Sequence, residues 1–105
     1  MKEISVKELA ALKESGADFQ LIDVREQNEV DIAEMGGELI PMNSVPENLD
    51  KFSKDKQVIV HCRSGVRSGN VIQYLEQNHG FNNLYNLAGG ILAYADEIDN
   101  SLTKY

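Results

Sequence analysis

The residue with the clearest chemical potential is Cys62, the only cysteine of the chain. It follows the apolar run Val58-Ile59-Val60 and His61, and it is followed by the loop Arg63-Ser64-Gly65-Val66-Arg67-Ser68. A thiol ionises readily beside cations or at a helix N-terminus, and the thiolate is the nucleophilic form. The sequence therefore predicts that Cys62 is an activated nucleophile.

The loop from Arg63 to Ser68 has the composition of an anion cradle. Its backbone can curl so that several N–H groups converge on one point, and a helix expected to begin near Ser68 adds further unpaired N–H groups. Gly65 permits a backbone conformation that a side chain disfavours. We expect these groups to stabilise an anion carried on the sulfur, as an oxyanion hole stabilises developing charge.

The two loop arginines each allow two interpretations. Arg63 either attracts an anionic substrate or is a solvated surface residue. Arg67 either binds the substrate anion or pairs with a carboxylate, for which Asp23 and Glu26 are the candidates. His61 is not expected to form a dyad with Cys62, because adjacent strand residues point to opposite faces.

The elements that must position this loop alternate between strands and helices. The strongest strand pattern is Gln57–His61, whose apolar run is typical of a central parallel strand. The periodicity predicts further strands over 19–24, 38–42 and 83–87, and helices over 6–16, 25–33, 46–52, 68–78 and 91–102. Such alternation predicts an α/β domain with a mostly parallel sheet, whose functional crevice lies beyond the carboxyl ends of the strands.

Composition limits the classes of protein to which the chain can belong. Its 105 residues, 42% hydrophobic and 26% charged, fit one globular domain over residues 1–105. The net charge of −7 argues against nucleic-acid binding, and no apolar run is long enough for a membrane helix. One cysteine and no secretory leader predict a cytoplasmic location.

Three motifs together resemble the rhodanese (sulfurtransferase) family. The Cys-x-x-x-x-Arg-Ser loop lies between a strand and a helix, Asp23-Val24-Arg25-Glu26 is similar to the first signature of that family, and Asn86–Tyr94 is similar to its C-terminal signature. The resemblance implies a three-layer α/β/α domain with a mostly parallel five-stranded sheet. It also implies a catalytic Cys62, a loop of residues 63–68 that binds substrate and persulfide, and a supporting role for Asp23 and Arg25.

The resemblance implies transfer of a sulfane sulfur. Cys62 would take the outer sulfur of a small anionic donor such as thiosulfate, or of another persulfide donor, and pass it to a thiol or protein acceptor, with no metal or organic cofactor. One alternative is a sulfur-carrier or interaction module that serves a protein partner, which the acidic surface favours. A cysteine-dependent phosphatase is a further alternative, but phosphatases of this type place five residues between cysteine and arginine, and here four separate Cys62 from Arg67.

Overall fold

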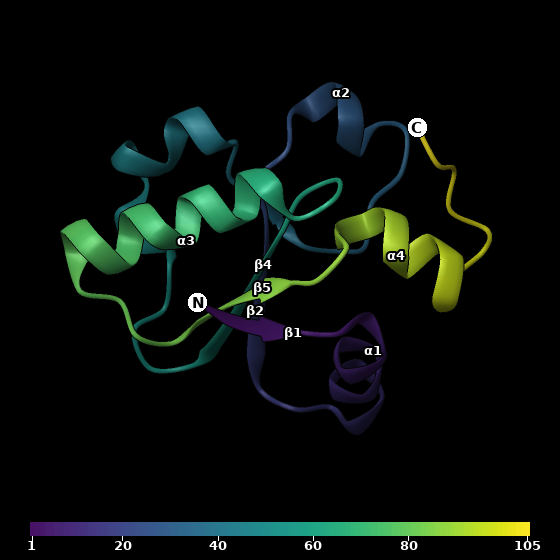
Figure 1. Ribbon diagram of the computed structural model, residues 1–105, viewed down its shortest axis with the longest axis horizontal. Helices are drawn as coiled ribbons and strands as arrows, with labels where there is room; N and C mark the ends of the chain where they lie inside the picture. The colour runs from purple at the N-terminus through teal and green to yellow at the C-terminus, as the bar shows by residue number, and fades with distance from the viewer.

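Five parallel strands form one sheet in the order β1-β5-β4-β2-β3. The computed structural model describes residues 1–105, and Figure 1 shows the sheet between two layers of helices. The strands are β1 (Lys2–Ile4), β2 (Phe19–Asp23), β3 (Glu38–Leu39), β4 (Gln57–His61) and β5 (Leu84–Leu87). The α/β class and the five-stranded parallel sheet are thus confirmed, and β4, which leads to Cys62, lies at the centre.

The helices divide between the two faces of the sheet. They are α1 (Val6–Ser15), α2 (Gln27–Val30), α3 (Val66–His79) and α4 (Gly90–Glu97), with two 3-10 helices, η1 (Met42–Glu47) and η2 (Leu49–Lys51). One apolar cluster joins α3 and the 3-10 helices to the sheet, and a second joins α1 and α4 to the opposite face. Burial on both faces explains why the middle of β4, Val58-Ile59-Val60, is apolar.

Alternation along β4 decides which layer each of its side chains faces. Val58, Val60 and Cys62 belong to the cluster beneath α3, whereas Ile59 belongs to the cluster beneath α1 and α4. Successive strand residues point to opposite faces, so His61 lies on the side of Ile59. The expectation that His61 and Cys62 diverge is confirmed.

Local capping signals explain several element boundaries. The Ser5 hydroxyl accepts from the Glu8 N–H at 3.1 Å, and the Glu8 carboxylate accepts from the Ser5 N–H at 3.0 Å, which completes a capping box at the start of α1. Gly16 ends the same helix at φ +70°, a left-handed conformation that favours glycine. The predicted extent of this helix is therefore confirmed.

Other predicted boundaries are wrong, and hydrogen bonds between Arg25 and Asp23 explain one of them. The helix expected over 25–33 is reduced to α2, because the Arg25 backbone and side chain are bonded to Asp23 and hold the chain extended before Gln27. Residues 46–52 form parts of η1 and η2 rather than an α-helix. Strand β1 has no periodic pattern in the sequence, since only its last residue is buried.

The helices at the two ends of the Cys62 region also differ from prediction. Helix α3 begins at Val66 rather than Ser68, and α4 begins at Gly90 and ends at Glu97 rather than Leu102. None of the helices combines the length and apolarity needed to span a bilayer. No group of three or more His, Cys, Asp or Glu side chains is arranged to hold a metal ion.

Candidate active site

The Cys62 side chain lies at the carboxyl end of β4, beneath the first turn of α3. Its thiol is buried, with 1% of the residue exposed. The loop turns at Gly65, which has φ +113° and directly precedes α3. This conformation brings the Gly65 N–H within 3.1 Å of Cys62 Sγ, to which it donates. The predicted cradle is therefore present around the sulfur.

Hydrogen bonds dominate the electrostatics of the Cys62 sulfur. Burial opposes ionisation of the thiol, but hydrogen bonds from the Ser68 side chain and from the backbone N–H groups of Ser68, Gly65 and Ser64 outweigh it and lower the pKa of Cys62 below its ordinary value. The N-terminus of α3, where the helix dipole is positive, also lowers the pKa of Cys62. The site thus favours the thiolate.

Ser68 and Asn86 form a hydrogen-bonded pair next to Cys62 Sγ. The sequence did not reveal this pair. The Ser68 hydroxyl lies 3.3 Å from Cys62 Sγ and 2.6 Å from the Asn86 amide oxygen, and it has one proton for two acceptors. The Asn86 amide nitrogen donates to the Gly65 carbonyl at 3.0 Å. Asn86 therefore supports both the hydroxyl and the turn of the loop.

The N-terminus of α4 supports the loop from the opposite side. The N–H of Ile91 donates to the Cys62 carbonyl at 3.0 Å, and the N–H of Leu92 donates to the Arg63 carbonyl at 3.2 Å. A side chain on Gly90 would place Cβ 2.4 Å from the Arg63 carbonyl oxygen. The turn expected at Gly89 and Gly90 thus has a second purpose, because it lets α4 approach the Cys62 loop closely.

The loop arginines are paired with groups that the sequence did not suggest. Arg67 forms two hydrogen bonds with the Glu29 carboxylate, at 2.7 and 2.8 Å, so the predicted pairing with Asp23 or Glu26 is wrong. Helix α2 directs the side chain of Glu29 toward α3. The Asp23 carboxylate already accepts hydrogen bonds from Arg25. Arg63 is exposed, and its guanidinium donates to the Tyr105 carbonyl.

Asp23 and Arg25 form a buried ion pair at the carboxyl end of β2. Arg25 is wholly buried and donates to the Asp23 carboxylate at 2.9 and 2.7 Å and to the Ala33 carbonyl at 2.8 Å. His61 Nε2 lies 3.6 Å from the same carboxylate, and burial lowers the pKa of this imidazole. These residues tie the segment 23–33 to the sheet, and none of these contacts reaches Cys62 Sγ.

The remaining loop residues, Ser64 and Val66, lie at the surface. Ser64 contributes its backbone N–H to the sulfur environment. Val66 is 69% exposed, which is unusual for an aliphatic residue, and it lies at the first position of α3.

Comparison with known proteins decides the family. The family model described as "Rhodanese-like domain" matches residues 5–97, nearly the whole chain. The chain belongs to the rhodanese-like family. The resemblance inferred from the Cys62 loop and the two signatures is confirmed.

Rhodanese-like relatives differ in size. A protein of Allochromatium vinosum named "Sulfurtransferase" is 33% identical over 90% of this chain and 89% of its own length. The chain is also 36% identical to "Rhodanese-like/PpiC domain-containing protein 12, chloroplastic" of Arabidopsis thaliana, of which it spans only 38%.

Among solved structures, a rhodanese-like domain protein from Staphylococcus aureus superimposes with a TM-score of 0.83. It is 35% identical to this chain, and the match covers 93% of this chain and 95% of the other. The fold is therefore shared over nearly the full length of both chains.

Proposed function

We propose that this protein is a sulfurtransferase that carries sulfur on Cys62. One observation carries the proposal: the Gly65 N–H donates to a buried Cys62 Sγ at 3.1 Å, at the start of α3. The same donors that favour a thiolate would also stabilise the terminal sulfur of a persulfide anion. The site therefore suits a covalent intermediate with a negative charge on sulfur.

The proposed reaction has two halves. In the first, the Cys62 thiolate attacks the outer sulfur of thiosulfate or another persulfide donor. The sulfur–sulfur bond of the donor breaks, and sulfite or a thiolate leaves with the electron pair. In the second, a thiophilic acceptor attacks the outer sulfur of the Cys62 persulfide and regenerates the thiolate. These steps predict ping-pong kinetics and require no metal or organic cofactor.

Intact-protein mass spectrometry tests this function. Exposure to thiosulfate or to an organic persulfide should add the mass of one sulfur atom, and addition of a thiol acceptor should remove it. Cys62→Ser should gain no mass. A wild-type protein that gains no sulfur from any sulfane donor would refute the proposal.

A second candidate is a carrier module that receives sulfur from a protein donor. The net charge of −7 favours this possibility, because an acidic surface suits a basic protein partner better than a small anion. In that case, loading of Cys62 by small donors should be slow, and a purified persulfidated protein donor should accelerate it. Fast turnover with small donors alone would exclude the need for a partner.

A further inference from the structure

Two carbonyl groups at the start of the Cys62 loop accept hydrogen bonds from α4. The Cys62 carbonyl accepts from the Ile91 N–H at 3.0 Å, and the Arg63 carbonyl accepts from the Leu92 N–H at 3.2 Å. In a trans peptide, the carbonyl and the N–H that follows it point in opposite directions. Each carbonyl that is bonded to α4 therefore turns the next N–H of the chain toward the other side of the loop, where Cys62 Sγ lies beneath α3.

This orientation of the backbone favours a negative charge on the sulfur. The Ser64 N–H, which follows the Arg63 carbonyl, is one of the groups whose hydrogen bonds lower the pKa of Cys62. A carbonyl turned toward the thiolate would instead bring the negative end of a peptide dipole close to a negative charge. The groups that hold the Cys62 and Arg63 carbonyls therefore contribute to the reactivity of Cys62 without contacting Sγ.

His61 lies beside the same Cys62 carbonyl. Its side chain is fully buried, and its Nδ1 lies 3.3 Å from the carbonyl oxygen, within hydrogen-bond distance. The other ring nitrogen, Nε2, lies 3.6 Å from Asp23 Oδ2 and has no hydrogen-bond partner. The imidazole is thus placed between two oxygen acceptors, and only the Cys62 carbonyl is close enough for a hydrogen bond.

The His61 ring is neutral at pH 7 and carries one proton. Burial is the main cause that lowers the pKa of this imidazole, and the positive charges of Arg25 and Lys13 lower it further. The negative charge of Asp23 and the hydrogen bond with the Cys62 carbonyl act in the opposite direction. A neutral imidazole has one N–H and one lone pair, so it can donate to only one of these two acceptors.

The Asp23 carboxylate competes poorly for the proton of His61. Arg25 donates four hydrogen bonds to this carboxylate, from its backbone N–H at 3.0 Å and from its guanidinium at 2.9, 3.2 and 2.7 Å. A carboxylate has about four lone-pair positions, so the bonds from Arg25 fill them. The proton therefore belongs on Nδ1, where it meets the Cys62 carbonyl.

We propose that His61 is a positioning residue, protonated on Nδ1, that donates to the Cys62 carbonyl and so fixes the peptide between Cys62 and Arg63. Together with the N–H from α4, it keeps backbone N–H groups turned toward the sulfur. The buried pair of Asp23 and Arg25 leaves the proton of His61 to the Cys62 carbonyl. This inference rests on the proposed function and adds a residue that acts on Cys62 from the opposite face of the sheet.

Nitrogen NMR of the wild-type protein tests the tautomer directly. In isotope-labelled protein, a protonated ring nitrogen and an unprotonated one resonate far apart, so the spectrum at pH 7 shows which nitrogen of His61 carries the proton. We expect a protonated Nδ1 and an unprotonated Nε2. A neutral ring with its proton on Nε2 would overturn the proposal, and this measurement needs no variant of His61.

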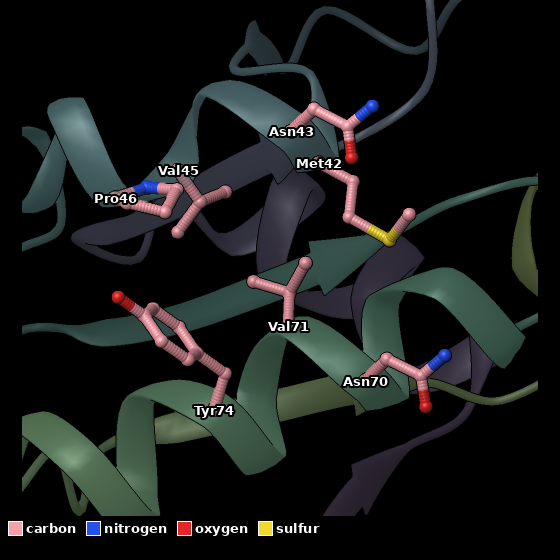
Figure 2. A pocket seen from close by; sticks show the side chains of 7 residues that line it. All are labelled: Met42, Asn43, Val45, Pro46, Asn70, Val71 and Tyr74. Atoms are coloured by element: carbon pink, nitrogen blue, oxygen red, sulfur yellow. The ribbon is translucent and has the colours of Figure 1, made fainter.

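His79, the other histidine of the chain, provides the reference signal. It lies in the last turn of α3, eleven residues, or about 16 Å along the helix axis, from Ser68. Its Nε2 lies 3.1 Å from the hydroxyl of Tyr74, and Figure 2 shows Tyr74 at a pocket between η1 and α3 that no residue of the Cys62 loop lines. The variant His79→Gln lacks these signals and so assigns the remaining ones to His61.

Two amide variants of His61 test the positioning role. His61→Asn places its amide nitrogen near the position of Nδ1, whereas His61→Gln places its amide nitrogen near Nε2. Alkylation of Cys62 by iodoacetamide at pH 7 should stay within about twofold of wild type in His61→Asn. It should slow about tenfold in His61→Gln, because the pKa of Cys62 rises. At a pH well above the pKa of the thiol, the two variants should react at the same rate.

His79→Gln is the matched control, because it makes the same substitution at the far end of α3 and should leave the alkylation rate unchanged. Thermal unfolding of each variant confirms that it is folded. Equal alkylation rates at pH 7 in folded His61→Asn and His61→Gln would overturn the positioning role. Sulfur loading of wild-type Cys62, measured by mass spectrometry, is a separate result: its failure would refute the proposed function, whatever the tautomer of His61.

Discussion

At the scale of single residues, Cys62 depends on its hydrogen bonds more than on nearby charge. The arginines that make the loop conspicuous in sequence are turned toward Glu29 and Tyr105, whereas backbone N–H groups and the Ser68 hydroxyl face the sulfur. Backbone amides are held in place by the fold, so they stabilise a negative charge on the sulfur without any rearrangement of the loop.

Replacement of Ser68 tests the contribution of its hydroxyl to the reactivity of Cys62. Ser68→Ala removes one donor to the thiolate, so the pKa of Cys62 should rise and alkylation by iodoacetamide at pH 7 should slow by about tenfold. Because Cys62 is the only cysteine, the alkylation rate reports on it alone. Ser15→Ala, at the far end of α1, is the control. An unchanged rate in Ser68→Ala would mean that the hydroxyl stays bonded to Asn86.

At the scale of elements, the site is built where three segments meet. Strand β4 delivers Cys62, the N-terminus of α3 surrounds its sulfur, and the N-terminus of α4 holds the carbonyl groups of Cys62 and Arg63. Helix α2 adds Glu29 from a fourth direction. The close approach of α4 to the loop requires glycine at its first position.

Gly90→Ala tests this close approach. The added Cβ would lie 2.4 Å from the Arg63 carbonyl oxygen, so the variant should lose about 2 kcal/mol or more of unfolding free energy and load sulfur more slowly. Gly36→Ala is a matched control, because Gly36 also has a positive φ, +84°, but nothing lies within 4 Å of an added Cβ. Its cost should be limited to about 1 kcal/mol of backbone strain, with normal sulfur loading. Equal losses in the two variants would contradict the role of the contact.

The link between α2 and α3 should depend on pH through Glu29. Its pKa falls from 4.5 to about 2 on folding, so the ionised carboxylate stabilises the fold above about pH 4.5, and this stabilisation disappears as the pH falls toward 2. The shift corresponds to at most about 3 kcal/mol. Urea unfolding of wild type and Glu29→Gln should show a difference in free energy that is full at neutral pH and small near pH 2. A difference that stays constant with pH would argue against the ion pair as its source.

At the scale of the whole molecule, negative charge dominates. The chain carries a net charge of −7, while the loop offers only two cations, both already paired. The molecule therefore repels anions at long range and stabilises a negative charge only after it forms on the sulfur inside the cradle. These two effects act at different distances, and salt weakens only the first of them substantially.

Ionic strength should therefore separate donors by charge. Raising salt from about 0.01 M to about 0.15 M shortens the screening length from about 30 Å to about 8 Å. The kcat/KM for thiosulfate, a dianion, should increase severalfold over this range, and that for a sulfur donor of lower charge should change less. A thiosulfate rate that falls with added salt would show that local attraction to the loop, rather than long-range repulsion, controls the encounter.

Local patterns in the sequence are enough to predict several parts of this protein. The capping box at Ser5, the apolar run of β4 and the turn at Gly65 each act over a few residues, so the α/β class, the central strand and the cradle around Cys62 could be predicted from them. Helix boundaries were predicted less accurately. Hydrogen bonds from Arg25 to Asp23, for example, prevent the helix predicted over residues 25–33.

The groups that face the arginines and those that surround the loop follow instead from long-range packing. Glu29 is 38 residues from Arg67, and Tyr105 is 42 residues from Arg63, so no spacing in the sequence pairs them. The contacts from Asn86 and from the start of α4 arise because parallel strands bring their carboxyl ends to one edge of the sheet. An ion pair is chosen by which charges the folded backbone brings within reach, and that choice is made by packing across the whole chain.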